Sequence, residues 1–376
     1  ALSNELRLLA RPDRAFDIPG ISGLYRRKLA AITFADTVTL RTLADQGFLD
    51  GGTDLDVIGR QLLGDATALN RFVARAFDGS ATPPFTLEGA TTAEVFANAQ
   101  AGLAGLAPGS APGSAEGPLV SVIMSAFNPD IALMRLAVQS VLAQTHAATE
   151  LFVVDDASEP AASAAIRDLL DSFPAADRAR LHYRRVAVNS GPYVGRNLAL
   201  AEARGAFIAI HDADDWAHPA RLQAQLAAFA ESPELRLVTS PHLRIDRFGG
   251  VQMEAGFTVF GDGPMTSLFR REVFDQIGDF ANVRSRGDVE MRERLRSYYG
   301  GHALVELAMP CMLCFADSAT LSQKTKAEAA EYLQIFRTNI SRKRDFSMLR
   351  RDNLPLGAEH RLVVPMPLRP PVETPA

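Results

Sequence analysis

Cysteine is scarce in this sequence, and its scarcity excludes two classes of protein. Among 376 residues the only cysteines are Cys311 and Cys314. Two cysteines are too few for a small secreted fold held together by disulfides. A single Cys-x-x-Cys pair, without a second pair or adjacent histidines, does not complete a zinc site. We therefore expect both side chains to be buried in an apolar strand.

The sequence also lacks a positive net charge and long hydrophobic runs. With 39 Lys and Arg against 44 Asp and Glu, the formal charge is -5, which gives no electrostatic basis for binding nucleic acid. No apolar run approaches the length of a membrane span, and no basic segment followed by an apolar core marks a signal peptide. We expect a cytoplasmic protein. Because the chain begins with Ala1, we also expect a piece of a longer protein.

The first part of the chain has a helical pattern. Apolar residues recur at spacings of three and four, and Gly51 and Gly52 break the pattern before Thr53, a typical N-cap. This predicts a helical domain at 1–105, for packing, oligomerisation or partner binding, with helices at 24–34, 37–46, 55–63 and 68–77. Residues 106–117, rich in Ala, Gly, Pro and Ser, are typical of a linker.

After the linker, predicted strands and helices alternate. Short apolar runs indicate strands at 119–127, 151–154, 181–188 and 206–210, and helical patterns lie between them at 131–143, 161–172 and 193–203. Alternation of this kind predicts βαβ units, and so an α/β domain at 118–320 with a mainly parallel sheet covered on both faces. The turn at 125–130 has no glycine, which excludes the dinucleotide fingerprint and the Walker A loop. Residues 321–376 are expected to form a C-terminal helix and tail.

Three acids follow the strand at 206–210. Asp212, Asp214 and Asp215 fall where this predicted strand ends. In open α/β sheets ligands bind outside the carboxyl ends of the strands, so carboxylates delivered there favour a functional site. The alternative is a solvated turn before a helix, because Asp is common in turns and at N-caps.

Several motifs, in order, resemble one known family. They occur at 120–128 (VSVIMSAFN), 152–158 (FVVDDAS), 189–197 (NSGPYVGRN), 211–216 (HDADDW), 266–274, 277–280 and 287–292. Together they resemble the family 2 glycosyltransferases over about residues 118–320. The resemblance implies the GT-A type of nucleotide-binding fold, an inverting glycosyltransferase activity and a nucleotide-sugar donor, with UDP-sugar expected.

The resemblance also implies roles for the donor side of the site. Of the Asp-x-Asp (DxD) acids, Asp214 would bind Mn²⁺ or Mg²⁺ on the diphosphate directly, and Asp212 would contact the ribose or the metal, with Asp215 beside them; both ions prefer oxygen ligands. Asp156 matches the acid that bonds the nucleotide base, and Arg196 matches a donor-binding arginine. The alternative roles of these last two are a capping acid and a surface arginine.

The general base is implied by a second match. Family members usually carry a Glu-Asp pair at the start of a helix, and here the pair is Gly287 and Asp288. Asp288 would receive the proton of the acceptor hydroxyl, with Glu290 and Asp262 as further candidates. The alternative is that Asp288 only caps the helix at 289–299.

The acceptor side is less defined by motifs. Trp216 is expected to face the acceptor, a glycan or lipid-linked glycan, because aromatic faces suit sugar rings; the alternative is simple packing. His211 and His218 are expected to support the acids and not to bind metal. The basic cluster at 342–344 is a candidate contact with an anionic membrane surface. By resemblance, bacterial surface polysaccharide is the expected setting.

Two other functions compete with this interpretation. A phosphohydrolase would use Asp212 as nucleophile and Asp214 as acid, but such enzymes carry Thr or Val at the position of Trp216. A catalytically silent scaffold would bind nucleotide or glycan and recruit partners through the N-terminal helices. Gly287, in place of the usual acid, is the best support for the scaffold.

Overall fold

The computed structural model describes residues 28–29, 31–32, 35–106, 117–254, 258–283 and 286–316. The chain divides into two compact units. The first comprises Ala1–Gly102 with Leu243–Gly261, and the second Leu103–His242 with Asp262–Ala376. The C-terminal helix and tail, the basic cluster at 342–344 and most of the linker predicted from sequence lie outside the described residues.

The first unit is built on short capped helices. They are α3 (Thr37–Asp45), α4 (Asp54–Leu62), α5 (Ala66–Arg75) and α6 (Thr92–Gly102). Thr53 and Asp56 form a capping box at the start of α4, and Asp36 and Asp65 accept hydrogen bonds from the first turns of α3 and α5. The helices predicted at 37–46, 55–63 and 68–77 are confirmed within two residues. Helix α6 was not predicted, and the segment at 24–34 is only partly described.

A segment from much later in the chain completes this unit. Strands β7 (His242–Asp246) and β8 (Val251–Gln252) pair in antiparallel fashion. The Gln61 amide exchanges two hydrogen bonds with the backbone of Val251, at 3.0 and 3.1 Å. Phe72 stacks on Phe260 with ring centroids 5.6 Å apart. The sequence analysis assigned 243–261 to the α/β domain, whereas its contacts assign it to the helical unit.

The second unit is organised around a seven-stranded sheet of order β10-β6-β9-β4-β1-β2-β3. Strands β3, β2, β1 and β4 are parallel, as are β6 and β10, and β9 runs antiparallel to both of its neighbours. The strands are β1 (Val120–Ala126), β2 (Thr149–Asp155), β3 (Leu181–Arg185), β4 (Phe207–Asp212), β6 (Leu237–Thr239), β9 (Leu268–Arg270) and β10 (Leu304–Glu306). The mainly parallel sheet predicted from the sequence is confirmed.

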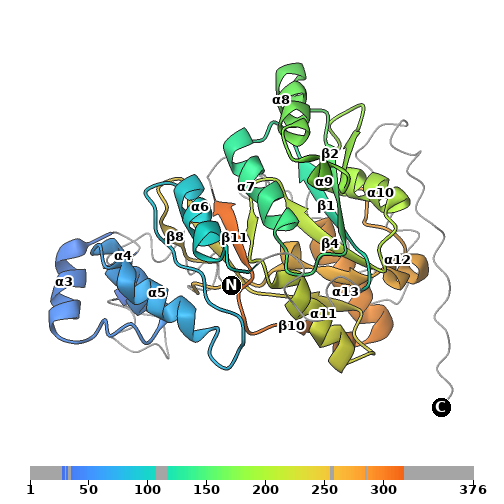
Figure 1. Ribbon diagram of the computed structural model, residues 1–376. Helices are drawn as coiled ribbons and strands as arrows, with labels where there is room; N and C mark the ends of the chain where they lie inside the picture. Colours follow the sequence, from blue (N-terminus) through green and yellow to red (C-terminus); the bar gives the residue numbers. More distant parts are fainter. Residues whose placement is uncertain are drawn as a thin grey trace, which may run out of the picture. The chain divides into compact units, whose positions relative to one another are not determined.

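Helices cover both faces of this sheet (Figure 1). Because successive strand residues point to opposite faces, Val122 and Ala209 pack against one helical layer and Ile123 and Ile210 against the other. The first layer holds α7 (Ile131–Leu142), α8 (Pro160–Asp171) and α11 (Arg221–Glu231), and the second holds α10 (Pro192–Glu202), α12 (Glu272–Ile277) and α13 (Gly287–Tyr299). Shorter elements are α9 (Ala175–Arg178), η1 (Pro264–Thr266), η2 (Gly301–Ala303) and an antiparallel pair formed by β5 (Trp216–Ala217) and β11 (Met312–Ala316).

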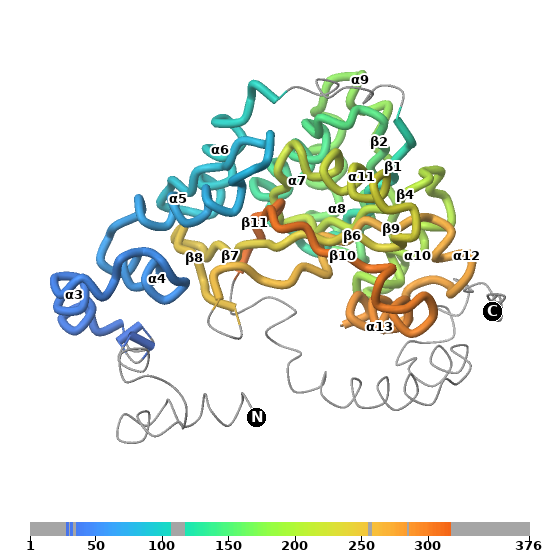
Figure 2. The backbone as a smooth tube through the Cα atoms, turned by 90° about the horizontal axis from the view of Figure 1, so that it is seen from below, coloured from blue at the N-terminus to red at the C-terminus, as the bar shows by residue number. Residues whose placement is uncertain are grey.

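The strand register aligns the ends where the acids stand. On β1, Ser125 pairs with Asp212 of β4, and Ala126 pairs with Asp155 of β2. The N–H of Asp156 bonds the carbonyl of Ala126 at 2.8 Å, directly beyond that register. The carboxyl ends of three adjacent strands therefore meet at one edge of the sheet. The three strands are labelled β2, β1 and β4 in Figure 2.

The two cysteines are buried, as expected from the sequence. Cys314 lies within β11 and Cys311 directly precedes it. Burial raises the pKa of the Cys311 thiol to about 11. A thiol with such a pKa is not a nucleophile at neutral pH, so Cys311 is a packing residue.

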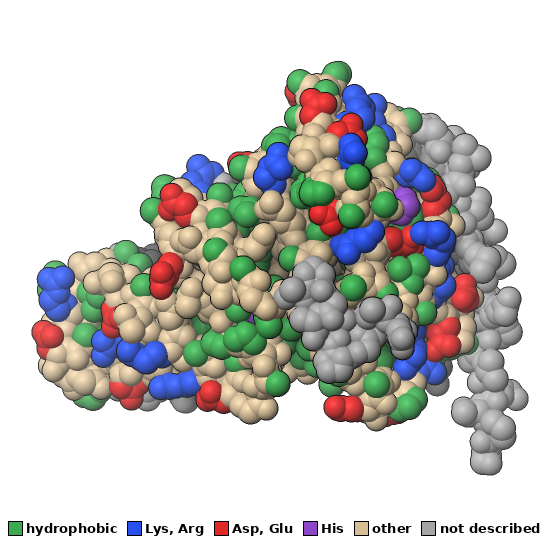
Figure 3. Space-filling model, in the orientation of Figure 1, with side chains coloured by type: hydrophobic (Ala, Val, Ile, Leu, Met, Phe, Trp, Pro, Cys, Tyr) green, Lys and Arg blue, Asp and Glu red, His purple; other side chains and the backbone are tan. Residues whose placement is uncertain are grey.

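None of the described helices is long and apolar enough to cross a bilayer. On the face shown in Figure 3, acidic and basic side chains are interspersed. Exposed ion pairs among the described residues, such as Arg184 with Glu202 and Arg296 with Glu293, are of a kind that contributes little to stability.

Candidate functional site

The turn after β4 separates its three carboxylates. Asp212 is the last residue of β4, and the N–H of Asp215 bonds its carbonyl at 3.3 Å to close the turn. The Asp212 side chain is 36% exposed and Asp214 is half-buried, whereas Asp215 is buried. Two carboxylates are therefore accessible at the strand end, while the third points into the protein.

Asp215 fastens this turn to β11. Its Oδ1 accepts a hydrogen bond from the N–H of Phe315 at 3.0 Å. Burial, followed by the charges of Asp214 and Asp212, raises the pKa of Asp215 well above its ordinary value. The strand end is thus a place of accumulated negative charge, which a bound cation would relieve.

Arg196 of α10 supplies a buried cation to the same edge. Its Nη2 donates to Oδ1 of Asp212 at 2.8 Å, and its side chain is only 3% exposed. Burial opposes the charged form, but Asp212 and other neighbouring groups outweigh it and raise the pKa of Arg196. Its Nε and Nη1 have no hydrogen-bond partner among the described residues. The alternative of a surface arginine is wrong, because the side chain is buried. The role of Arg196 in donor binding stays a prediction.

Asp156 shapes the loop that leads into α10. Its two oxygens accept hydrogen bonds from the backbone N–H groups of Ser190 and Gly191, each at 2.8 Å, and from Nδ2 of Asn189 at 3.1 Å. The residue is buried at the end of β2. Asp156 therefore sets the entry of α10 into the site, and its contact with a nucleotide base stays a prediction.

Asp288 lies in the first turn of α13, half-buried. Its Oδ1 accepts hydrogen bonds from the hydroxyl of Tyr193 at 2.9 Å and from the N–H of Val289 at 2.8 Å. The N-cap is Arg286, in a left-handed conformation and without a side-chain cap. Asp288 thus accepts a hydrogen bond within the first turn of α13, although it is not the N-cap residue. It also contacts α10 through Tyr193.

The two further candidates for the base are engaged elsewhere. Both Asp262 oxygens accept from Nη1 of Arg292 at 2.7 Å. Glu290 is buried in a bidentate pair with Arg294, at 2.6 and 2.8 Å. Asp288 is the candidate whose contacts connect it to the strand-end acids.

This connection runs through α10. Tyr193 and Arg196 lie one helical turn apart, and the guanidinium of Arg196 sits 4.9 Å from the centre of the Tyr193 ring. Arg196 bonds Asp212 and Tyr193 bonds Asp288, so one helix turn joins the two acids. Tyr193 lies within the motif at 189–197, and no role was predicted for it from the sequence.

Trp216 corrects the sequence expectation for the acceptor side. Its side chain is completely buried in β5, where it pairs with Leu313 of β11. An indole without exposed surface does not contact an acceptor, so packing, the alternative weighed above, describes Trp216. His211 and His218 are also fully buried. Burial and then the charge of Arg221 lower the pKa of His211 to about 3, so its imidazole is neutral.

Asp212 and Asp214 can bind a divalent cation only if a bound substrate supplies further oxygen ligands. Within the described ranges, no group of three or more His, Cys, Asp or Glu side chains is arranged to hold a metal ion. Asp212 and Asp214 can offer hard oxygen ligands from one turn. Such a pair suits Mg²⁺ or Mn²⁺ when substrate phosphates complete the coordination.

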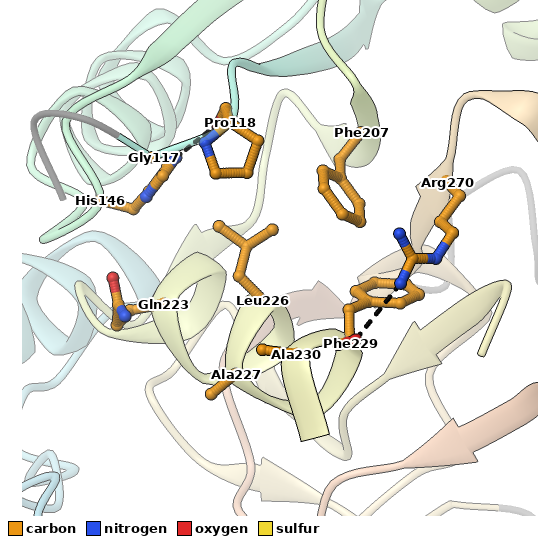
Figure 4. A pocket seen from close by; sticks show the side chains of 10 residues that line it. All are labelled: Gly117, Pro118, His146, Phe207, Gln223, Leu226, Ala227, Phe229, Ala230 and Arg270. Atoms are coloured by element: carbon orange, nitrogen blue, oxygen red, sulfur yellow. Dashed lines mark hydrogen bonds between the residues drawn. The ribbon is translucent and has the colours of Figure 1, made fainter. Parts of the chain in front are cut away.

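A pocket of about 320 Å³ lies away from this edge (Figure 4). It is lined by Pro118 before β1, by Phe207 at the start of β4, and by Leu226 and Phe229 of α11. Arg270 stacks on Phe229 with its guanidinium 4.9 Å from the ring centre. These residues mark the amino ends of β1 and β4, opposite to the acids, so the pocket is not part of the candidate site.

Comparisons with known proteins relate part of this chain to glycosyltransferases. The model of glycosyl transferase family 2 matches residues 121–278. A putative teichuronic acid biosynthesis glycosyltransferase, TuaG of Bacillus subtilis, is 37% identical over 114 residues, which are 30% of this chain and 43% of that protein. The succinoglycan biosynthesis protein ExoO of Rhizobium meliloti is 37% identical over 112 residues, 29% of each chain. ExoU of the same organism is 34% identical over 183 residues, 42% of this chain and 51% of ExoU. The chain spans about half or less of the length of these relatives.

Proposed function

We propose that this chain, whose residues 121–278 match the model of glycosyl transferase family 2, is a metal-dependent inverting glycosyltransferase. It moves a sugar from a nucleoside diphosphate donor, UDP-sugar in our proposal, to a hydroxyl of a glycan acceptor. The observation that carries the proposal is the pair of contacts from one turn of α10, Arg196 to Asp212 and Tyr193 to Asp288. These contacts join the donor acids to a second carboxylate that is available as a base.

The donor is held at the carboxyl ends of β2 and β4. Asp214 and Asp212 would hold Mn²⁺ or Mg²⁺, and such an ion would offset the charge that develops on the departing diphosphate. Arg196 orients Asp212 and directs its remaining N–H groups toward an anion. Asp156 keeps the loop before α10 in place and bonds the nucleotide base.

Asp288 acts on the acceptor. A bond forms between the acceptor oxygen and the anomeric carbon while the bond from that carbon to the diphosphate breaks. The hydroxyl proton passes to the Asp288 carboxylate, and attack from the side opposite the diphosphate inverts the anomeric centre. A carboxylate on a helix packed against the sheet is held in position for this step.

The names of the relatives support a setting. TuaG is named for teichuronic acid biosynthesis and ExoO for succinoglycan biosynthesis. We place this chain in the synthesis of a bacterial surface polysaccharide. The acceptor is then a glycan or lipid-linked glycan at the cytoplasmic side of the membrane, and the helical unit serves oligomerisation or partner binding.

Calorimetric titration with a panel of nucleoside diphosphates, first with Mn²⁺ and then with a chelator, tests the proposal. We expect binding that depends on metal, selects one base and is lost in Asp214→Ala. Absence of binding under both conditions would reject the donor site. Binding without transfer to any acceptor would favour the silent scaffold.

A further inference from the structure

A buried tyrosine, Tyr193, contacts the candidate base. The Tyr193 hydroxyl donates to Oδ1 of Asp288 at 2.9 Å. Its ring is packed beside Phe280, with centroids 6.0 Å apart, and against the guanidinium of Arg196 at 4.9 Å. These contacts and the burial of Tyr193 hold the ring, so the hydroxyl has a defined position toward the carboxylate.

The same ring accounts for the glycine beside Asp288. A Cβ built on Gly287 would lie 2.8 Å from two ring atoms of Tyr193, closer than real Cβ atoms approach other atoms. Gly287 is the first residue of α13, with no positive φ, so its backbone conformation is open to any residue. The ring of Tyr193 is therefore what requires glycine at 287. With the Tyr193 ring in this position, an acid at 287 would have no room unless the ring or the helix moved.

We propose that Tyr193 is the positioning residue for Asp288, holding its carboxylate toward the acceptor in a chain that has no acid at 287. The inference rests on the proposed function, because it requires Asp288 to receive the acceptor proton. Burial and the adjacent Asp288 raise the pKa of Tyr193 well above its ordinary value, so the phenol stays protonated and donates its hydrogen bond throughout the neutral range.

Tyr193→Phe tests the proposal, because it keeps the ring and removes the hydroxyl. A hydrogen bond to a charged group contributes enough for its loss to lower kcat roughly tenfold or more. We expect this fall in kcat with unchanged KM for the donor and unchanged donor affinity by calorimetry. A purely structural tyrosine would instead change stability, and donor binding with it.

Tyr183→Phe is the matched control. The Tyr183 hydroxyl donates to Oδ2 of Asp155 at 2.8 Å, so it is a second Tyr-Asp pair in the same unit; among the described residues its contacts do not include Asp212, Asp214 or Asp288. We expect this variant to lower Tm about as much as Tyr193→Phe does and to leave kcat unchanged. Equal losses of kcat in the two variants would overturn the inference.

A second pair of variants tests the steric relationship. Gly287→Ala places a methyl group against the ring and should lower kcat. In a Tyr193→Ala background the methyl group has room, so adding Gly287→Ala should cause no further loss; this is the non-additivity expected of residues in contact. Losses of kcat that simply add in the double variant would contradict the proposal that the Tyr193 ring and a side chain at 287 compete for the same space.

The outcome for Asp288 separates this inference from the proposed function. If Asp288→Asn is inactive and Tyr193→Phe keeps the wild-type kcat, the inference is overturned and the proposed base stands. If Asp288→Asn transfers at the wild-type rate, the proposed base is rejected, and the positioning role falls with it.

Discussion

Arg196 and Asp212 form an ion pair whose two members differ in exposure, with the guanidinium 3% and the carboxylate 36% exposed. The buried partner is fixed by Tyr193 and Phe280, whose ring centres lie 4.9 and 6.0 Å from it. The exposed partner is thereby held in one orientation at the end of β4. An acid that is oriented before a ligand arrives loses less conformational freedom on binding.

We predict that Arg196→Lys lowers donor affinity by about tenfold. Lysine keeps the positive charge but loses the planar group that stacks on Tyr193 and donates in fixed directions. Calorimetric titration with the preferred nucleoside diphosphate measures the effect. Arg184→Lys is the control, because Arg184 of β3 forms an exposed ion pair with Glu202, which lies on α10 as Arg196 does. Equal donor affinity in the two variants would contradict the prediction.

We predict that Asp214→Ala removes the metal dependence of donor binding. The variant leaves Asp212 alone at the strand end, and one carboxylate is a weak site for a hard divalent ion. Titrations with and without Mn²⁺ should then coincide. Asp168→Ala, an exposed position on α8, should keep the difference. If donor binding by Asp214→Ala still depended on Mn²⁺, Asp214 would not be the metal ligand.

We predict that Asp288→Asn lowers kcat by about 10²- to 10⁴-fold, the usual contribution of a general base. Asparagine is nearly isosteric and can still accept the hydrogen bond of Tyr193, so donor affinity and Tm should change little. Steady-state kinetics with the identified donor and acceptor give the result. Retained transfer would reject Asp288 and direct attention to Asp262 and Glu290.

We predict that Gly205→Ala lowers the free energy of unfolding by about 1–3 kcal/mol, the range for overpacking. A Cβ at Gly205 would lie 2.5 Å from the backbone nitrogen of Ser121 and 2.8 Å from the carbonyl oxygen of Leu119, atoms that cannot move aside easily. Urea denaturation measures the change. Gly301→Ala, where a Cβ meets no atom within 4 Å, should leave the free energy of unfolding nearly unchanged.

We predict that Glu150 makes stability depend on pH in the acidic range. Burial would raise the pKa of Glu150, but hydrogen bonds from Ser121 and Arg204 outweigh burial and lower it from the ordinary value of 4.5. A lowered folded-state pKa gives stability that is complete above the unfolded-state pKa and is lost as the pH falls through the folded-state value. Glu150→Gln should therefore be less stable at pH 7 and show a shallower loss of Tm on acidification. Equal slopes for both proteins would contradict this.

The order of strands and helices in the second unit could be predicted because the signal is local. Buried strands such as β1 and β4 are continuous apolar runs, and the helices between them keep a regular spacing of apolar residues. Acids after such strands necessarily fall at the carboxyl edge of a parallel sheet. This is why Asp212 and Asp156 were placed at strand ends from sequence.

Contacts between distant segments could not be predicted in this way. Trp216 is buried because β5 pairs with β11, roughly 95 residues later in the chain. The sequence around Trp216 contains no signal that predicts this pairing. The same holds for Tyr193, whose hydroxyl meets a residue on α13. Gly287, which stands where the family usually has an acid, was the available signal for this contact. A glycine at such a position implies that another side chain, here the ring of Tyr193, occupies the space.

The late segment 243–261 has a consequence for how the chain folds as it is made. In vectorial synthesis an N-terminal domain commonly folds before the rest has left the ribosome. Here Asp54 accepts a hydrogen bond from the N–H of Val259, and Thr92 donates to the carbonyl of Asp246. The N-terminal helices therefore cannot complete their contacts until residue 261 has emerged, when four parallel strands of the other unit have already been translated. The helical unit, although first in the sequence, is completed only after those strands have been made.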